Sequence, residues 1–356
     1  MKETLVEVND LHINFEVREG TVKAVQGTTF KINRGQTTGV IGESGCGKSI
    51  TAKAIMQMIP HPGKIVQGEV LYHFSDKTNP SQEEIIRIND LDPDGSRIRE
   101  IRGGEIGMIF QEPMSSLTPV YTAGYQIGEA LSLHRLVPQK LGDQMDSTIQ
   151  KYRHVTKKEA REIAIDMLHK VGLPKPERRV DSYPHELSGG QRQRVMVAIA
   201  LSCDPVMLIA DEPTTALDVS IEAQILDIMR DLQETEDMAI MFITHNLGVV
   251  AGMAEDIIVM YMGKQVEHAS ADDIFYNSKH PYTKALLQSI PKVGRRTTDR
   301  LASIKGMVPS PFELPTGCVF HPRCPSFMPG KCDQIVPTWQ EVEENHWVSC
   351  LLYEEV

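Results

Sequence analysis

Apolar and polar positions follow two different patterns along this chain. Residues 11–15 (LHINF) alternate at a period of two, and Gly20 and Gly27 interrupt the surrounding segment, which is typical of short antiparallel strands over residues 4–33. Later runs are continuously apolar and cover residues 206–210, 239–243 and 257–262. Continuous apolar runs are typical of parallel strands that are buried on both faces. The pattern therefore predicts an α/β fold with an antiparallel sheet near the N-terminus and a parallel core after it.

The spacing of apolar residues also predicts helices between the strands. Further strands are expected over 36–41, 66–74 and 105–110, and helices over 50–59, 121–134 and 192–201. Thr156 and Glu159 have the spacing of a capping box, and Gly172 ends the apolar helical period that follows them. Three polar stretches without such a period are predicted as two surface insertions and a linker. They are residues 75–100, 135–155 and 292–305.

Composition and charge limit the possible functions. The chain has 356 residues and a formal net charge of −11, which argues against nucleic-acid binding because such proteins normally carry a basic surface. Residues 1–20 carry acidic side chains and no apolar core, so no secretory signal is expected. No apolar run is long enough to span a membrane. We expect a cytoplasmic protein, which could still sit on a membrane by binding a partner.

A glycine-rich segment after the strand at 36–41 fits the phosphate-binding pattern G-x-x-x-x-G-K-[ST]. Its residues are Gly42, Glu43, Ser44, Gly45, Cys46, Gly47, Lys48 and Ser49. A strand before it and a helix after it are what such a P-loop needs, because backbone N–H groups at the helix start bind phosphate. Lys48 would bind the β- and γ-phosphates of ATP, and Ser49 would bind Mg²⁺. A glycine-rich turn that fits by chance is the alternative for this motif alone.

Two further motifs carry candidate chemistry. The apolar run 206–210 ends in Asp211 and Glu212, so Asp211 would hold Mg²⁺ and Glu212 would polarise the attacking water. The second motif, LSGGQ at 187–191, opens a helix and offers further donors to phosphate. Its candidate ligands are Ser188, Gly189, Gly190 and Gln191. Two acids at a strand end and a simple helix cap are the alternatives for these two motifs in isolation.

The order of these motifs resembles that of ATP-binding-cassette ATPases. The resemblance covers residues 1–265 and implies a P-loop NTPase (RecA-like) core, an antiparallel β subdomain and a helical subdomain at about 112–186. It implies that Gln111 links the Mg²⁺ and γ-phosphate site to the transporter, that His245 contacts the γ-phosphate, and that Asp218 is the D-loop aspartate. Phe15 stands where the family stacks an aromatic ring on adenine, and Ile50 completes the nucleotide-binding positions. The resemblance also implies dimers in which the P-loop of one subunit and LSGGQ of the other enclose each ATP.

Four cysteines gather in the loop-rich, proline-rich tail. They are Cys318, Cys324, Cys332 and Cys350. In a cytoplasmic protein such a group suggests a metal before disulfides, and four thiolates suit a [4Fe–4S] cluster or Zn²⁺. Close C-x-x-C pairs, which zinc sites favour, do not occur. Cys46 and Cys203 stand apart from this group; Cys46 is expected to be an ordinary P-loop residue and not a redox sensor, and Cys203 a buried apolar residue.

The tail carries a second resemblance. Residues 317–325 (GCVFHPRCP), 111–119 (QEPMSSLTP) and 280–283 (HPYT) are similar to segments of oligopeptide and dipeptide importer ATPases, although Asn is more usual at position 118. That resemblance assigns residues 266–356 to the C-terminal region of this subfamily and favours the iron–sulfur cluster over zinc.

The two resemblances together imply an ATPase subunit that powers peptide import at the cytoplasmic face of the cell membrane. Its expected partners are two membrane permease subunits, a second ATPase subunit and, indirectly, a solute-binding protein, with no nucleic acid. The alternatives are a nickel or other solute importer of the same subfamily, a soluble ATP-switched factor and a redox iron–sulfur protein. ATP-switched factors usually carry two cassettes or a long coiled coil, and this chain has neither.

Overall fold

The structure is a computed structural model, and it describes residues 3–76, 79–111, 116–138, 152–214, 219–289 and 304–354. Two compact units make up the chain: a first unit of residues 1–93 and 241–356, and a second unit of residues 94–240. Within the described ranges, no helix has both the length and the apolar character that a membrane span requires.

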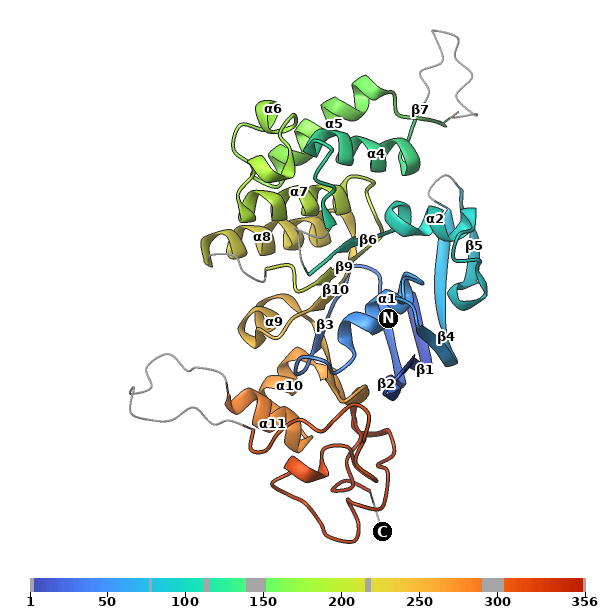
Figure 1. The fold of residues 1–356 in the computed structure, drawn as a ribbon, viewed down its shortest axis with the longest axis vertical. Helices are drawn as coiled ribbons and strands as arrows, with labels where there is room; N and C mark the ends of the chain where they lie inside the picture. Colours follow the sequence, from blue (N-terminus) through green and yellow to red (C-terminus); the bar gives the residue numbers. More distant parts are fainter. Residues whose placement is uncertain are drawn as a thin grey trace. The chain divides into compact units, whose positions relative to one another are not determined.

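The N-terminal part of the first unit is an antiparallel sheet with the strand order β2-β1-β4-β5 (Figure 1). The strands are β1 (Thr4–Val17), β2 (Gly20–Asn33), β4 (Gly63–Asp76) and β5 (Asn79–Arg87). The alternating pattern is confirmed, since Leu11 and Ile13 are fully buried. The strands are longer than expected because Gly27 does not interrupt β2. Leu11 pairs with Thr28 and His12 with Gln26, so Gly27, at φ 79°, is an extra residue without a partner on β1. It therefore forms a bulge and does not end the strand.

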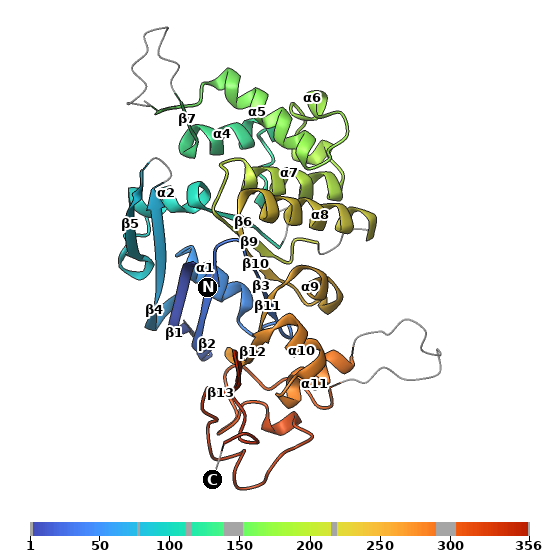
Figure 2. The ribbon, with the colours of Figure 1, turned by 180° about the vertical axis from the view of Figure 1, so that it is seen from behind.

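The P-loop strand β3 (Thr37–Ile41) belongs to a second sheet of the first unit, and all its residues are buried. Within this unit the order is β13-β14-β12-β11-β3, and β11 runs parallel to β3. The other strands are β11 (Asp256–Tyr261), β12 (Lys264–Ser270), β13 (Gln340–Glu343) and β14 (His346–Val348). The last two come from the tail (Figure 2), where β14 pairs with β12 and β13 pairs with β14. The tail thus shares a sheet with the strand that leads into the P-loop.

Short helices complete the first unit. They are α1 (Lys48–Ile55), η1 (Ile88–Asp90), α9 (Leu247–Met253), α10 (Ala271–Asn277), α11 (Pro281–Gln288) and η4 (His321–Arg323). The helix predicted over 50–59 begins earlier and ends earlier than expected. It ends at Ile55 because Gln57 adopts a positive φ of 49° and the Met58 amide donates to the Lys53 carbonyl at 2.7 Å. This is the hydrogen-bonding pattern of a helix C-terminus.

The second unit combines two parallel strands with helices. β6 (Ile106–Ile109) pairs in parallel with β9 (Met207–Asp211), as the apolar runs predicted. The helices are α2 (Ser96–Glu100), α4 (Ala123–His134), α5 (Lys157–Lys170), α6 (Pro176–Arg179), α7 (Gly189–Leu201) and α8 (Val219–Glu236), with short turns η2 (Ile101–Glu105) and η3 (Pro184–Glu186). The capping box of Thr156 and Glu159 forms at the start of α5. The buried strand β10 (Ala239–Ile243) lies at the sequence boundary of the two units.

The polar stretches contain more regular structure than predicted. Residues 75–100, expected as a surface excursion, contain β5, η1 and α2, because Ile86, Ile88 and Ile98 supply buried anchors. In the stretch 135–155, β7 (Leu136–Pro138) pairs with β8 (Tyr152–His154), and residues 139–151 lie outside the described residues. Residues 290–303 also lie outside them, so most of the predicted linker at 292–305 is not described.

Candidate functional site

The P-loop connects β3 to α1 in the first unit, as the motif predicted. Gly42 has φ 151°, and a Cβ there would lie 2.2 Å from the Met260 carbonyl oxygen. Gly47 has φ 99°, and a Cβ there would lie 2.5 Å from the Ala24 carbonyl oxygen. Both positions therefore require glycine, because the backbone conformation and the close approach of another chain segment each exclude a side chain.

Lys48 is the buried cation of this loop. Its Nζ donates to the carbonyl oxygens of Gly42 at 2.8 Å and Glu43 at 3.1 Å, and the side chain is almost inaccessible. The ammonium group therefore lies inside the curve of the loop, where a phosphate-binding lysine is needed. Burial raises the pKa of the neighbouring Cys46 thiol despite the nearby Lys48 charge. Cys46 is thus a buried, protonated residue of the P-loop.

Ser49 and Ile50 lie in the first turn of α1. Phe15, on β1, lies against Gly63 of β4, since a Cβ at Gly63 would come within 2.6 Å of the Phe15 ring. The ring is half-buried, so part of it is accessible for stacking. His245 is exposed and follows β10 directly. Their roles toward ATP stay predictions.

In the second unit, Gln111 and Glu212 meet at the carboxyl ends of two neighbouring strands. β6 and β9 are parallel; Glu212 directly follows the last residue of β9, and Gln111 lies two positions beyond the last residue of β6. The Gln111 Nε2 donates to the Glu212 Oε2 at 3.1 Å. Asp211 precedes Glu212 and is buried. The structure thus brings together two of the residues that the sequence assigned separately to catalysis.

The LSGGQ segment forms the N-terminus of α7. The Gln191 amide donates to the Ser188 Oγ at 3.4 Å, and the Ser188 amide donates to the Gln191 Oε1 at 3.1 Å, which makes a capping box. Ser188 and Gly189 are exposed, and a Cβ on Gly189 would meet no other atom within 4 Å. The start of α7 is therefore open to an incoming ligand. Asp218, the expected D-loop aspartate, lies outside the described residues.

The four tail cysteines are free thiols in the first unit. Burial is the main cause that raises the pKa of Cys318, of Cys324 and of Cys350, the last to about 12. The charges of the other tail cysteines, including Cys332, raise these pKa values further, so the thiols lie within electrostatic range of one another. Across the described ranges, however, no three His, Cys, Asp or Glu side chains are placed to hold one metal ion. The metal-binding part of the fold prediction is therefore not confirmed.

A tail arginine contacts the P-loop directly, which the sequence did not indicate. The Arg323 Nη1 and Nη2 donate to the Glu43 carboxylate at 2.6 and 3.1 Å. The Glu43 amide donates to the hydroxyl of Tyr282 at 2.9 Å. Both partners lie in segments that were noticed only for their family resemblance, 280–283 and 317–325. No local pattern could have paired them with Glu43.

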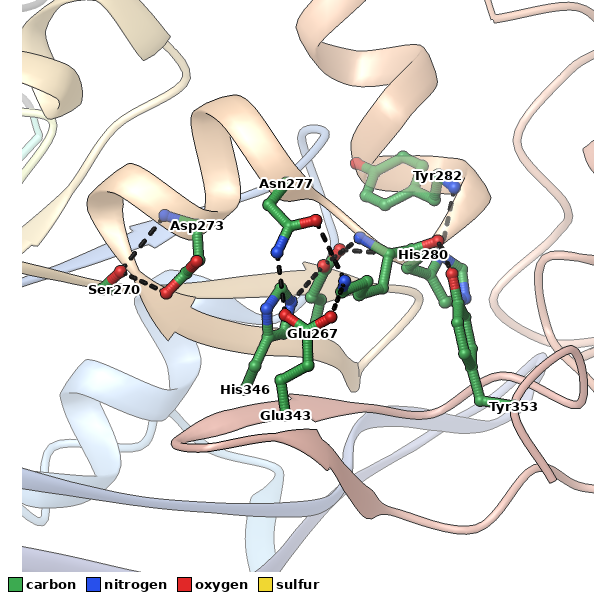
Figure 3. A network of polar contacts seen from close by, with 10 residues as sticks. Glu267, Ser270, Asp273, Asn277, His280, Tyr282, Glu343, His346 and Tyr353 are labelled. Atoms are coloured by element: carbon green, nitrogen blue, oxygen red, sulfur yellow. Dashed lines mark hydrogen bonds and ion pairs between the residues drawn. The ribbon is translucent and has the colours of Figure 1, made fainter. Parts of the chain in front are cut away.

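The tail is also attached through a buried carboxylate on β12 (Figure 3). Glu267 is fully buried and accepts from the His280 amide at 3.0 Å and from the His346 Nε2 at 2.8 Å. His346 belongs to β14, and His280 caps α11. The Tyr353 hydroxyl donates to the Lys279 carbonyl at 3.1 Å. This network holds the tail hairpin against the start of α11.

Comparison with known proteins agrees with this geometry. The family model "ABC transporter" matches residues 25–215, and the model "Oligopeptide/dipeptide transporter, C-terminal region" matches residues 266–332. The chain is 44% identical to the oligopeptide transport ATP-binding protein AppD of Bacillus subtilis, over 99% of this chain and 98% of that protein. It is 41% identical to the dipeptide transport ATP-binding protein DppD of the same organism, over 99% of this chain and 96% of that protein.

Among solved structures, the dimeric ATP-binding cassette MJ0796 bound to ADP and Pi is similar, with a TM-score of 0.59 and 26% identity. The match covers 75% of this chain and 99% of the cassette. The P-loop core and the β sheets are those of an ABC ATPase, as the motifs predicted. The chain therefore belongs to the ABC transporter family of ATPases, among the oligopeptide and dipeptide transport ATP-binding proteins.

Proposed function

We propose that this chain is the subunit that binds and hydrolyses ATP to power peptide import through a membrane transporter. The observation that carries the peptide assignment is its similarity to AppD over nearly the whole length of both chains. The assignment of ATP rests on the family match and on the P-loop geometry, in which Gly42 and Gly47 shape the loop around Lys48.

Hydrolysis needs a residue that activates water. The Glu212 carboxylate accepts a proton from water as the water oxygen bonds to the γ-phosphorus, and the bond from that phosphorus to the β–γ bridging oxygen breaks. The products are ADP and inorganic phosphate. Gln111 positions Glu212 through their hydrogen bond, and His245 contacts the γ-phosphate. Lys48 and the P-loop amides bind the phosphates.

Ser49, Gln111 and Asp211 are the residues that would hold Mg²⁺. Hydroxyl, amide and carboxylate oxygens are the hard ligands that Mg²⁺ prefers, so the donor set fits this ion. When bound, Mg²⁺ neutralises charge on the phosphate oxygens.

A dimer is proposed because Ser188 and Gly189 of the signature segment at the start of α7 are exposed, and a Cβ on Gly189 would meet no other atom. In the dimer, Ser188, Gly189, Gly190 and Gln191 of one subunit bind the ATP held by the P-loop of the other, and Asp218 is proposed as the D-loop aspartate. The further proposed partners are two permease subunits, with a solute-binding protein acting through them, and the chain works at the cytoplasmic face of the membrane.

We propose that the four tail cysteines hold a [4Fe–4S] cluster, with Zn²⁺ as the alternative. The raised pKa values of Cys318, Cys324 and Cys350 in one segment support the proposal, because a bound cation would stabilise the thiolate forms. In this proposal the cluster stabilises the tail.

The function is tested by titrating the purified chain with MgATP and by measuring ATP-driven peptide uptake in vesicles that contain the assembled transporter. Lys48→Ala should weaken ATP binding about tenfold or more, because it removes a charge-assisted contact to phosphate. The matched control is Lys53→Ala, in the last turn of the same helix. Unchanged ATP affinity in Lys48→Ala would refute the P-loop assignment, and ATP-driven uptake of another solute class in place of peptides would refute the transport assignment.

A further inference from the structure

The Arg323 side chain is one of the most enclosed cations in the tail, with a relative exposure of 4%. Its guanidinium forms a two-pronged ion pair with the Glu43 carboxylate. Nη1 also donates to the Tyr261 hydroxyl at 3.2 Å, and Nε donates to the Lys305 carbonyl at 3.3 Å. These contacts fix the plane of the guanidinium, and the hydrogen bond to Glu43 is the main cause that raises its pKa. Arg323 is therefore a permanent and well-oriented positive charge.

The partner of this charge belongs to the P-loop. Glu43 directly follows Gly42, and its carbonyl oxygen accepts from the Lys48 Nζ. Its amide is held by the Tyr282 hydroxyl. Arg323 thus fixes the side chain of a residue whose backbone already contacts the phosphate-binding lysine.

A rigid aromatic group supports Arg323. The rings of Tyr261, Tyr282 and Phe320 lie with centroids 4.7, 5.2 and 5.4 Å apart. Tyr282 and Phe320 are almost fully buried. Phe320 lies in the same tail segment as Arg323, so its packing holds that segment against β11 and α11.

The charges of Arg323 and Glu43 bear on the binding of ATP at the P-loop. Glu43 carries a negative charge at the loop that is proposed to bind a polyanionic triphosphate, and like charges at close range repel. An ion pair with Arg323 neutralises that charge and holds the carboxylate in one direction.

We propose that Arg323 is a positioning residue for the nucleotide site: by neutralising and orienting Glu43, the tail raises the affinity of the P-loop for ATP. This inference rests on the proposed binding of ATP at the P-loop. It extends that proposal by assigning the tail segment 318–324 an effect on the first step of the ATPase cycle.

The experiment is a double-mutant cycle on the full-length purified chain, with MgATP affinity measured by equilibrium titration. Arg323→Gln should weaken ATP binding about tenfold, the order of magnitude of a coupling between charges in direct contact. In a Glu43→Gln background, the same Arg323→Gln change should cost less than about threefold, because no carboxylate is left to repel the phosphates. Arg323→Lys keeps the charge without the two-pronged geometry and should fall between the wild-type chain and Arg323→Gln.

Salt and two further variants separate the possible causes. The defect of Arg323→Gln should shrink as ionic strength rises, since salt screens the repulsion from Glu43. Lys331→Gln removes a tail cation that contacts the Leu351 carbonyl and not the P-loop, so it should leave ATP affinity unchanged. Lys48→Ala tests the ATP site itself, independently of the tail.

The outcomes are distinct. Wild-type affinity in Arg323→Gln overturns the proposal. The proposal is also overturned if Arg323→Gln lowers ATP affinity equally in the wild-type and the Glu43→Gln backgrounds, because Arg323 would then act only through folding. If Arg323→Gln does not fold, the ATP affinities of the wild type, Arg323→Lys and Glu43→Gln/Arg323→Lys are compared instead. Arg323→Lys should bind ATP more weakly than the wild type, and adding Glu43→Gln should restore part of that affinity. If adding Glu43→Gln does not raise the affinity of Arg323→Lys, the proposal is overturned. Failure of Lys48→Ala to weaken binding would instead refute the ATP assignment.

Discussion

Glu212 adopts a backbone conformation that few residues with a side chain adopt. Its φ is 49°, in the left-handed region, and its carboxylate accepts a hydrogen bond from Gln111. The next residue, Pro213, is held by a hydrogen bond from the buried Gln193 side chain to its carbonyl oxygen. The protein thus stabilises an unfavourable conformation at the residue proposed to activate water, where strained residues often occur.

We expect Glu212→Gln to keep ATP binding and to lower ATP turnover by roughly 10²-fold or more, because an amide cannot accept the proton from water. It should also prolong the ATP-bound dimer. Steady-state ATPase of the assembled transporter and equilibrium ATP titration measure the two effects. Glu234→Gln, the same change at an exposed position of α8, is the control. Near-normal turnover in Glu212→Gln would show that another group activates the water.

At the scale of the element, α11 depends on a histidine that must remain neutral. His280 caps α11, and its Nδ1 accepts from the Tyr282 amide at 3.0 Å. Burial lowers the pKa of His280 from 6.5 to about 4, against the opposing effect of Glu267. Protonation would place a donor at Nδ1, where the cap requires an acceptor. Helix α11 therefore carries both the His280 cap and Tyr282, whose hydroxyl contacts the P-loop.

This arrangement predicts a loss of stability in acid. The folded state binds fewer protons than the unfolded state between the two pKa values, so the contribution of His280 is complete above pH 6.5 and falls as the pH drops toward about 4. The shift corresponds to a few kcal/mol. His280→Asn keeps a capping acceptor but cannot titrate, so its unfolding midpoint should vary less over this pH range than that of the wild type.

Urea unfolding at several pH values measures this difference. The exposed His169 on α5, changed in the same way, should leave the pH dependence unchanged. If His280→Asn and the wild type lose stability in parallel between pH 6.5 and 4, other groups control the acid response.

At the scale of the whole molecule, the tail is part of the first compact unit and not an independent appendage. Its strands β13 and β14 extend the sheet of β12, and Glu267 and Arg323 attach it at two places. The tail has few regular elements of its own, so these contacts and the proposed cluster must offset the entropy of ordering it, which is about 1–2 kcal/mol per backbone residue.

We expect protein that is purified without oxygen to be brown and to contain roughly four irons per chain. Cys324→Ser should bleach the colour and make the tail sensitive to protease. ATP should still bind, but more weakly to the extent that the adjacent Arg323 is released. Metal analysis and limited proteolysis are the measurements, and Cys203→Ser, outside the tail, should retain the iron. Zinc in place of iron would refute the cluster but keep the ligands, and an ordered tail without metal would refute both.

Features that depend on local spacing could be predicted from the amino-acid order alone. The P-loop, the capping box of α5, and the apolar strands β9 and β10 were predictable because their residues lie within a few positions of one another. Burial on both faces produces continuous apolar runs, and a helix start selects its capping residues, so these patterns can be read without a structure. Gln111 and Glu212 were assigned to catalysis separately, and their hydrogen bond was not predicted.

Contacts between distant segments could not be predicted from the sequence and are seen only in the folded chain. Arg323 and Glu43 are 280 positions apart, and Glu267 and His346 are 79 apart. The sequence around an arginine or a buried glutamate does not identify the residue it will pair with, because the pairing depends on how the fold brings strands and loops together. For the same reason the sequence did not predict β5. This polar stretch forms a strand because it pairs with β4, and that pairing has no signal in the local sequence.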